Sequence, residues 1–167
     1  MGLARLLLGA FCVMLVGLGG TLAANDLPLW DTPGPLVRIA TYLNAHQART
    51  AEDSPFPELR PRYYAHGPSA LFLRVPEAVA TLPRWTITGR DPESRTVHAV
   101  VTSAFFGFED DVLITIVPEP GRPVVHVQAT SRVGRGDLGT NTRHILDLYA
   151  ALEAIGLRGQ HEPRSGR

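Results

Sequence analysis

Residues 103–143 read SAFFGFEDDVLITIVPEPGRPVVHVQATSRVGRGDLGTNTR, and this stretch determines the order of the central structural elements. It contains an apolar run at residues 112–117, a Pro/Gly turn at residues 118–121 and an alternating apolar and polar run at residues 124–131. Such runs are typical of β-strands, and the turn favours antiparallel pairing between them. A loop rich in glycine and arginine follows at residues 132–142 and leads into a helical pattern.

The neighbouring segments extend this pattern on both sides. Two further alternating runs, at residues 85–89 and 96–104, precede it and bring the number of predicted strands to four. One helical pattern with Ser69 as its expected cap lies before the strands and is interrupted by Pro76, and another follows and ends at Gly156. The sequence therefore predicts an α+β core domain at residues 69–156. We expect a four-stranded antiparallel sheet with helices packed on its apolar face.

The first 25 residues are typical of a targeting segment. Arg5 precedes an apolar run, and no charged residue occurs in the 20 residues from Leu6 to Asn25. This length suits a transmembrane anchor, whereas the small residues up to Ala23 suit a signal peptide that is cleaved there. Arg5 favours a cytoplasmic N-terminus. We therefore expect either a membrane-anchored protein with an extracytoplasmic domain or secretion to the periplasm after cleavage near Ala23.

Between this segment and the core, residues 26–68 predict a short amphipathic helix and a proline-rich linker. The helix is expected to begin near Asp31-Thr-Pro33, and four apolar residues then share one helical face: Leu36, Ile39, Ala40 and Leu43. Trp30 just before it would suit the interface of a membrane. At the other end, residues 157–167 are polar and basic, and we expect a flexible tail.

Charge and cysteine content narrow the function classes. The 16 basic residues, all of them arginine, balance 16 acidic ones, so no net field points to a nucleic acid partner. The single cysteine, Cys12, lies inside the apolar run, which leaves the exported domain without a disulfide. We expect no bound cofactor, because the glycine loop fits neither a Walker loop nor a dinucleotide-binding motif.

Two groups of residues carry a resemblance to a known family. One is Asp110-Asp111-Val112 after an aromatic cluster, and the other is the loop from Ser131 to Arg143 with its glycines, Asp137 and Asn141. On these residues the chain resembles the domain-of-unknown-function 1499 family over roughly residues 57–154. The resemblance implies an N-terminal hydrophobic segment in many members and no assigned activity. A Cys-Val-Ser motif found in some members is absent here, so no role of that cysteine carries over.

The loop contains the main candidate binding residues: Arg132, Arg135, Asp137, Asn141 and Arg143. Its glycines permit close approach of a partner, and it leads into a helix N-terminus, where free N–H groups favour an anion. The arginines offer the fork geometry that suits a carboxylate or phosphate. In the structural alternative, Asp137 or Thr140 caps the helix, Asn141 fixes the turn and the arginines pair with Asp110 and Asp111.

Asp110 and Asp111 are the candidate metal or catalytic carboxylates. Together with Asp137 they would suit a metal-dependent hydrolase, although consecutive strand residues point to opposite faces of a sheet. The sequence favours a binding or accessory module over an enzyme. We expect it to recognise an anionic group, a lipid or an envelope partner. The alternatives are the metal-dependent hydrolase and a purely structural envelope component.

Overall fold

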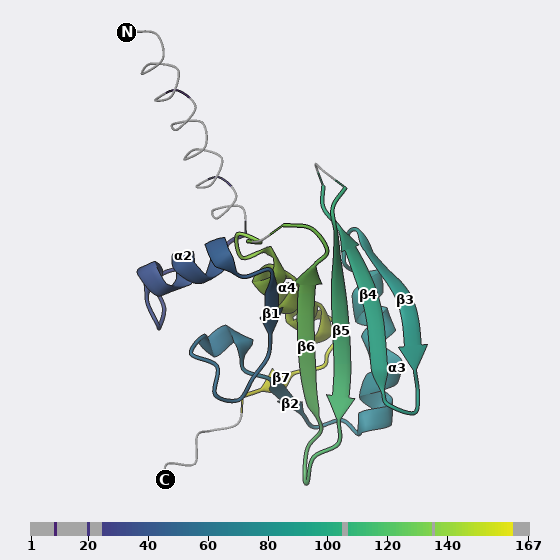
Figure 1. Ribbon diagram of the computed structural model, residues 1–167. Helices are drawn as coiled ribbons and strands as arrows, with labels where there is room; N and C mark the ends of the chain where they lie inside the picture. Colours follow the sequence, from purple (N-terminus) through teal and green to yellow (C-terminus); the bar gives the residue numbers. More distant parts are fainter. Residues whose placement is uncertain (1–8, 10–19, 21–24, 105–106, 135, 162–167) are drawn as a thin grey trace, which may run out of the picture.

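The computed structural model describes residues 9, 20, 25–104, 107–134 and 136–161. Its described residues form an α+β fold with three named helices and one antiparallel sheet of seven strands (Figure 1). The elements are, in order, α2 (Pro35–Asn44), β1 (Gln47–Arg49), the 3₁₀-helix η1 (Pro57–Leu59), β2 (Arg62–Tyr64), α3 (Pro68–Ala80), β3 (Trp85–Asp91), β4 (Thr96–Thr102), β5 (Glu109–Val117), β6 (Val124–Ser131), α4 (Thr140–Ala154) and β7 (Gly159–Gln160).

The four predicted strands are the centre of the sheet, in the order β3-β4-β5-β6, and all neighbours are antiparallel. The predicted number of strands was wrong. The free edge of β6 pairs with β1 at one end and with β2 at the other, and β2 in turn pairs with β7. These three strands have two or three residues each, too few to show a period in the sequence.

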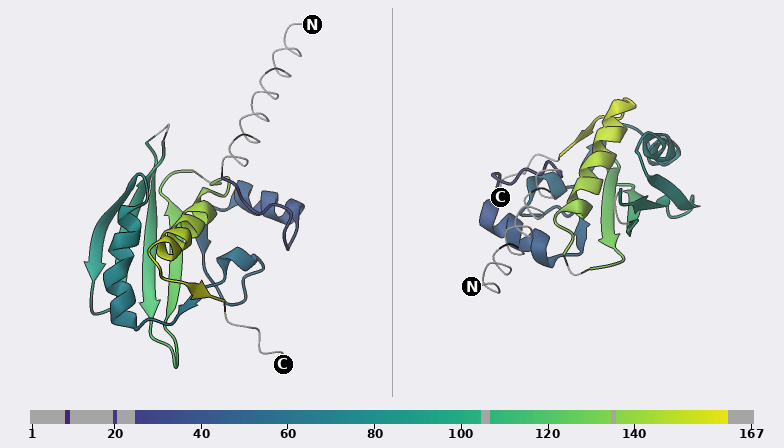
Figure 2. Two further views of the ribbon diagram at one scale, coloured as in Figure 1. Left: turned by 180° about the vertical axis from the view of Figure 1, so that it is seen from behind. Right: turned by 90° about the horizontal axis from the view of Figure 1, so that it is seen from above.

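Helices α3 and α4 cover one face of the sheet, as Figure 2 shows from behind. The alternation predicted for β4 and β6 is confirmed on that face, and β5, which the sequence showed only as a continuous apolar run, alternates in burial as well. The apolar residues there are almost fully buried: Val97, Ala99, Val101, Val112, Ile114, Ile116, Val125, Val127 and Ala129. Residues of α4 such as Ile145 and Leu152 pack against them in one hydrophobic core. The opposite face carries polar residues and is open to solvent over much of its area.

Helices α2 and α3 begin at glycine–proline pairs rather than at the expected caps. Helix α3 starts at Pro68 after Gly67 and runs without interruption through Pro76, and α2 starts at Pro35 after Gly34. Proline suits the first helical position because its missing N–H would have no partner there. The caps predicted at Ser69 and near Asp31-Thr-Pro33 were therefore wrong by two or three residues.

The predicted helix over α2 is present, but its apolar face points away from the core. The buried residues of α2 are Arg38 and Tyr42, whereas Leu36 and Leu43 are exposed. Helices of water-soluble proteins normally bury their apolar stripe, so α2 is inverted with respect to that rule.

A buried ion pair accounts for the inversion. The Arg38 guanidinium is fully buried and donates two hydrogen bonds to the carboxylate of Glu58 in η1. Nη2 lies 3.0 Å from Oε2, and Nη1 donates to Oε1. It also donates to the carbonyls of Asp31 and Thr32, at 3.1 and 2.6 Å, and to the Tyr42 hydroxyl at 3.2 Å. These partners satisfy most of the guanidinium and fasten α2 to the segment before β2.

Among the described residues, no helix combines the length and apolarity needed to cross a membrane. Nearly all of the apolar run predicted at residues 1–25 lies outside the described residues.

The Arg38–Glu58 pair leads to a first prediction. Glu58→Gln leaves the buried Arg38 charge without its counter-charge, and we expect the free energy of unfolding to fall by about 3–5 kcal/mol. Chemical denaturation measures this loss. The matched control is Glu77→Gln, which breaks the exposed pair with Arg74 and should cost less than about 1 kcal/mol. Equal losses in the two variants would contradict a structural role for the buried pair.

Candidate functional site

The glycine-rich loop before α4 packs against the end of α2. The N–H groups of Asp137 and Leu138 donate to the carbonyls of Ala45 and Tyr42, both at 2.9 Å. A Cβ at Gly136 would lie 2.1 Å from the carbonyl oxygen of Leu43, so only glycine permits this approach. The last carbonyls of a helix have no hydrogen-bond donor within the helix itself. The loop supplies such donors to the carbonyls at the end of α2.

Asp137 lies two residues before the N-cap of α4, which is Gly139. Its Oδ1 accepts from the N–H of Gly139 at 2.7 Å, and its Oδ2 accepts from Nδ2 of Asn141 at 2.7 Å. Burial raises the pKa of Asp137, although these hydrogen bonds and one from the Asn141 backbone act in the opposite direction. The structural alternative, in which Asp137 or Thr140 is the cap, was wrong about the cap residue: the N-cap is Gly139, without a side-chain cap hydrogen bond, and Asp137 fixes the turn before it.

Asn141 is fully buried and joins three segments. Its Nδ2 lies within hydrogen-bond distance of Asp137 Oδ2, of the Ser131 hydroxyl at 2.9 Å and of the His46 carbonyl at 3.0 Å. Ser131 in turn hydrogen-bonds to Asp110. A polar chain therefore runs from the loop, through the first turn of α4, to strands β6 and β5.

Asp110 ends this chain in a buried pair with His144 of α4. Oδ2 of Asp110 lies 2.9 Å from Nε2 of His144, and the edge of Trp85 packs on the imidazole with ring centroids 5.8 Å apart. Burial alone would raise the pKa of Asp110, but the hydrogen bonds from His144 and Ser131 outweigh it and hold the pKa below its usual value. The carboxylate and the ring are thus fixed against one another.

Asp111 points to the opposite, open face of the sheet. Its carboxylate accepts from Nε and Nη2 of Arg132, at 2.8 and 2.7 Å, and Arg132 also contacts Glu109. The Arg132 hydrogen bond is the main cause that lowers the pKa of Asp111. The strand therefore separates Asp110 from Asp111. No group of three potential metal ligands forms among the described residues.

A polar pocket of about 380 Å³ opens beside the first turns of α4. Asp110 and His144 line it from the sheet and the helix, and two arginines contribute to its wall. Arg143 pairs with Asp147 one turn later, Nη2 and Nε lying 2.6 and 2.8 Å from Oδ1. Arg84 has no hydrogen-bond or ion-pair partner for its guanidinium in the described part of the chain. The remaining lining residues are Asn25, Val101, Thr102, Ser103, Ala104 and Thr140.

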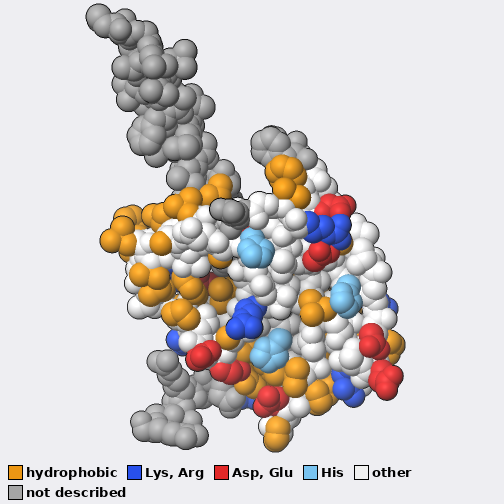
Figure 3. Space-filling model, in the orientation of Figure 1, with side chains coloured by type: hydrophobic (Ala, Val, Ile, Leu, Met, Phe, Trp, Pro, Cys, Tyr) orange, Lys and Arg blue, Asp and Glu red, His pale blue; other side chains and the backbone are white. Residues whose placement is uncertain are grey.

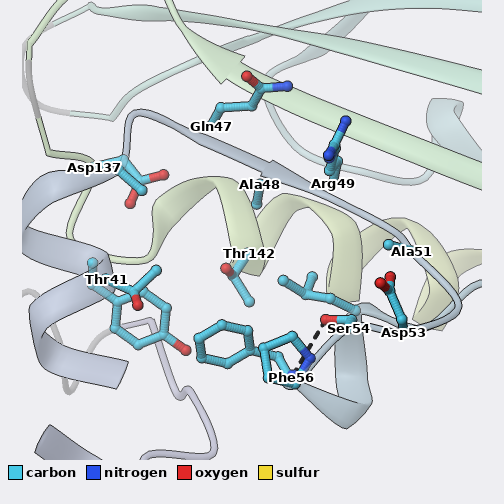
Figure 4. A pocket seen from close by; sticks show the side chains of 14 residues that line it. Thr41, Gln47, Ala48, Arg49, Ala51, Asp53, Ser54, Phe56, Asp137 and Thr142 are labelled. Carbon is cyan, nitrogen blue, oxygen red and sulfur yellow. Dashed lines mark hydrogen bonds between the residues drawn. The ribbon is translucent and has the colours of Figure 1, made fainter. Parts of the chain in front are cut away.

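A second pocket of about 300 Å³ lies between α2, β1 and the segment before η1 (Figure 4). Thr142 of α4 lies near its middle, with Asp137 towards one end and Asp53 towards the other. The Asp137 carboxylate already accepts hydrogen bonds from Gly139 and Asn141. The pocket beside α4 is therefore the better candidate site, because it combines an unpaired guanidinium with a buried carboxylate–imidazole pair.

Of the sequence-predicted residues, the structure brings Asp137 and Asn141 together and links them to Asp110 through Ser131. It places Arg143 in the polar pocket and Arg132 on the other face of the sheet. Arg135 lies outside the described residues.

A family model described as a protein of unknown function, DUF1499, matches residues 38–152, more than half of the chain. The chain belongs to the DUF1499 family. The match begins at the buried Arg38, well before the expected start near residue 57, and it includes Glu58 and the whole polar chain from Asp137 to His144. No curated protein matches the chain.

His144 and Arg84 line the polar pocket beside α4 but were not among the candidate residues from the sequence. His144 lies four residues before Leu148 and thus on the inward face of α4, a signal that was present in the helical spacing. Arg84 precedes β3 with a positive φ of 65°, and no pattern in the sequence indicates its position. Ser103 and Asp147, which line the same pocket, likewise carry no motif.

Packing of the glycine loop against α2 gives a second prediction. Gly136→Ala forces a methyl group into the Leu43 carbonyl, so the free energy of unfolding should fall by at least about 2 kcal/mol. Gly67→Ala is the matched control, since a Cβ there meets no atom within 4 Å and should cost less than about 1 kcal/mol. Denaturant titration compares the two, and a harmless Gly136→Ala would show that the loop does not pack as described.

The two adjacent aspartates give a third prediction. Asp110→Asn removes the charged partner of His144 and should lower the free energy of unfolding by about 1.5–3 kcal/mol at pH 7, whereas Asp111→Asn on the open face should lower it less. Because folding lowers the pKa of Asp110, its contribution is complete above its ordinary value of 3.8 and is lost as the pH falls through the folded-state pKa.

Unfolding curves of the wild type and Asp110→Asn across acidic pH measure this dependence. We expect the difference between them to shrink below pH 3.8. A difference that stays constant down to the lowest pH at which both fold would rule out the carboxylate as its source.

Proposed function

We propose that the chain is a membrane-anchored binding module whose pocket beside α4 recognises an anionic group. The observation that supports this most directly is the Arg84 guanidinium, which lines the pocket without a partner among the described residues. Each carboxylate of the pocket already has a partner, Asp110 with His144 and Asp147 with Arg143. Arg84 is therefore the group there that a bound anion can pair with.

Arg143 is the second expected contact for the anion. Asp147 takes only Nε and Nη2 of its guanidinium, which leaves other N–H donors of the fork for a ligand. Thr140 adds a hydroxyl at the pocket wall. The volume of about 380 Å³ lies within the range of ~300–1,000 Å³ common for small-molecule sites.

The proposed anion site is the pocket lined by Arg84 and Arg143, whereas the sequence had indicated the N-terminus of α4. The N–H groups of Gly139 and Asn141 there donate to Asp137, and Gly136 and Gly139 of the loop lie against α2. Arg132 likewise has two carboxylate partners on the far face of the sheet. Asp137 and Asn141 then act by positioning the first turn of α4, which carries Arg143.

A second candidate function is hydrolysis with His144 as a general base, because Asp110 holds its ring at the pocket as an orienting carboxylate does in many enzymes. We rank it below binding. No hydroxyl of the described residues hydrogen-bonds to the imidazole, so an activated nucleophile is missing from the arrangement. The metal-dependent variant with Asp110, Asp111 and Asp137 has less support, because β5 directs the first two carboxylates to opposite faces.

The location proposed for the module follows from the sequence of residues 1–25. We propose that the domain lies outside the cytoplasm, held by this segment as an anchor or released after cleavage near Ala23. The anion would then be a lipid headgroup, a small envelope solute or a carboxylate of an envelope protein. A purely structural envelope component remains the alternative in which the pocket binds nothing.

The fourth prediction tests the anion site with inorganic phosphate. We expect phosphate to shift the side-chain NMR signals of Arg84 and Arg143 in the full chain, held in neutral detergent micelles, and to do so saturably. Arg84→Ala should weaken the apparent affinity about tenfold, since a charged hydrogen bond contributes ~1.5–3 kcal/mol. A parallel titration with an anionic phospholipid in the micelle distinguishes a headgroup ligand from a free one.

Arg95→Ala is the matched control, because Arg95 also has a positive φ, 54° against 65° for Arg84, and lines a different pocket. It should leave the phosphate titration unchanged. The binding proposal fails if phosphate shifts neither signal, or if Arg84→Ala and Arg95→Ala titrate like the wild type.

A further inference from the structure

Helix α2 presents an uncharged apolar surface to the outside of the molecule. This surface, called here the α2 face, consists of Leu36, Val37, Ala40 and Leu43. Leu36 is 84% exposed, Val37 50% and Leu43 42%, and Trp30 just before the helix is 85% exposed. Figure 3 shows hydrophobic side chains gathered over α2 on this side of the molecule.

The α2 face cannot turn inward, because the opposite side of the helix is fixed. Arg38 and Tyr42 lie one turn apart on that side, and Arg38 is held by Glu58 and by two carbonyls. Turning α2 over would separate Arg38 from the nearly buried Glu58, a loss of ~3–5 kcal/mol, and would also break the hydrogen bonds to two carbonyls and to Tyr42, whereas each leucine that it buried would contribute only ~1.5–3 kcal/mol. The exposure of Leu36 and Leu43 is therefore built into the fold.

The chain before α2 indicates what covers this face. The 20 residues from Leu6 to Asn25 carry no charge and are long enough to span a bilayer. Their end is fixed to the domain, since Asn25 Nδ2 donates to the Leu138 carbonyl at 3.0 Å and Leu27 is buried against Tyr42. From Asn25 to Trp30 the chain spans at most about 17 Å, so a membrane reached by Asn25 is within reach of Trp30 and α2.

We infer that α2 lies in the interfacial layer of a lipid bilayer, with the α2 face in the acyl region and Trp30 at the headgroup level. This inference rests on the membrane anchoring proposed above, but it does not depend on what the pocket binds. The chemistry fits an interfacial helix, because the surface is apolar and uncharged and is flanked by tryptophan. Docking would fix the orientation of the domain on the membrane instead of leaving it on a free tether.

The test, our fifth prediction, uses the full chain in phosphatidylcholine vesicles that contain a lipid brominated near the glycerol. The chain has two tryptophans, so Trp85→Phe leaves Trp30 as a single probe. Leu36→Trp in a background of Trp30→Phe and Trp85→Phe reports on the α2 face itself. Leu73→Trp in the same background is the matched control, because Leu73 is also exposed but lies on α3, on the other side of the molecule (Figure 2).

Flotation of the vesicles first establishes whether the chain is membrane-bound. We then expect brominated lipid to quench Trp30 and the tryptophan at position 36 about twofold, since an interfacial helix lies ~5–10 Å deep. The tryptophan at position 73 should keep its emission.

Three results would overturn the inference. If the chain floats with the vesicles but the tryptophan at position 36 is quenched no more than the one at position 73, the anchor is supported and the docking of α2 is wrong. If the chain does not float, both the membrane anchor and the docking of α2 are wrong. The phosphate titration still tests whether the pocket binds an anion. A blue shift at position 36 that follows protein concentration and not lipid assigns the α2 face to a second copy of the chain.

Discussion

A chain of buried and partly buried hydrogen bonds runs from His144 through Asp110, Ser131 and Asn141 to Asp137, and it crosses from β5 and β6 to α4 and the loop against α2. Burying a polar group costs free energy unless it is hydrogen-bonded, so removing one member of this chain leaves its neighbour without a partner. Asn141 is the branch point, because its amide reaches three segments of the chain. The start of α4 is therefore fixed by hydrogen bonds as well as by apolar packing.

Two functional consequences follow from that constraint. The glycine loop joins α2 to α4 through residues 136–138, whose backbone packs against α2 and is therefore not free for a ligand. The fixed first turn of α4 instead directs Arg143 and His144 to the polar pocket, where Arg84 approaches from the start of β3. Asn25 lines the same pocket and directly follows the apolar run. Under the proposed anchoring, the pocket opens near the lipid headgroups, which connects anion recognition with the docking of α2.

The sequence predicted those helices and strands that are long enough to show a repeating pattern of apolar residues. Strand β6 was predicted with its observed bounds, and the face of α4 was predicted from its apolar spacing. Strands β1, β2 and β7 are too short to show a period, and their pairing depends on chain segments far apart in the sequence. The orientation of α2 was unpredictable for another reason: Arg38 is buried only because Glu58, outside its helix, supplies the counter-charge. The structural alternative from the sequence paired the loop arginines with Asp110 and Asp111 without choosing between them, and Arg132 pairs with Asp111 on the open face of the sheet. The pairing of Asp110 with His144 in the candidate site requires knowledge of which strand face α4 covers.

The coupling between Asp110 and Asn141 tests the central claim most directly, because the two residues are joined through Ser131. A double-mutant cycle with Asp110→Ala and Asn141→Ala measures it by chemical denaturation. If the buried chain acts as one unit, the double variant should be more stable than the sum of the two single losses predicts, by about 1 kcal/mol or more. Losses that add to within ~0.3–0.5 kcal/mol would show that the two residues act independently, and would contradict the account.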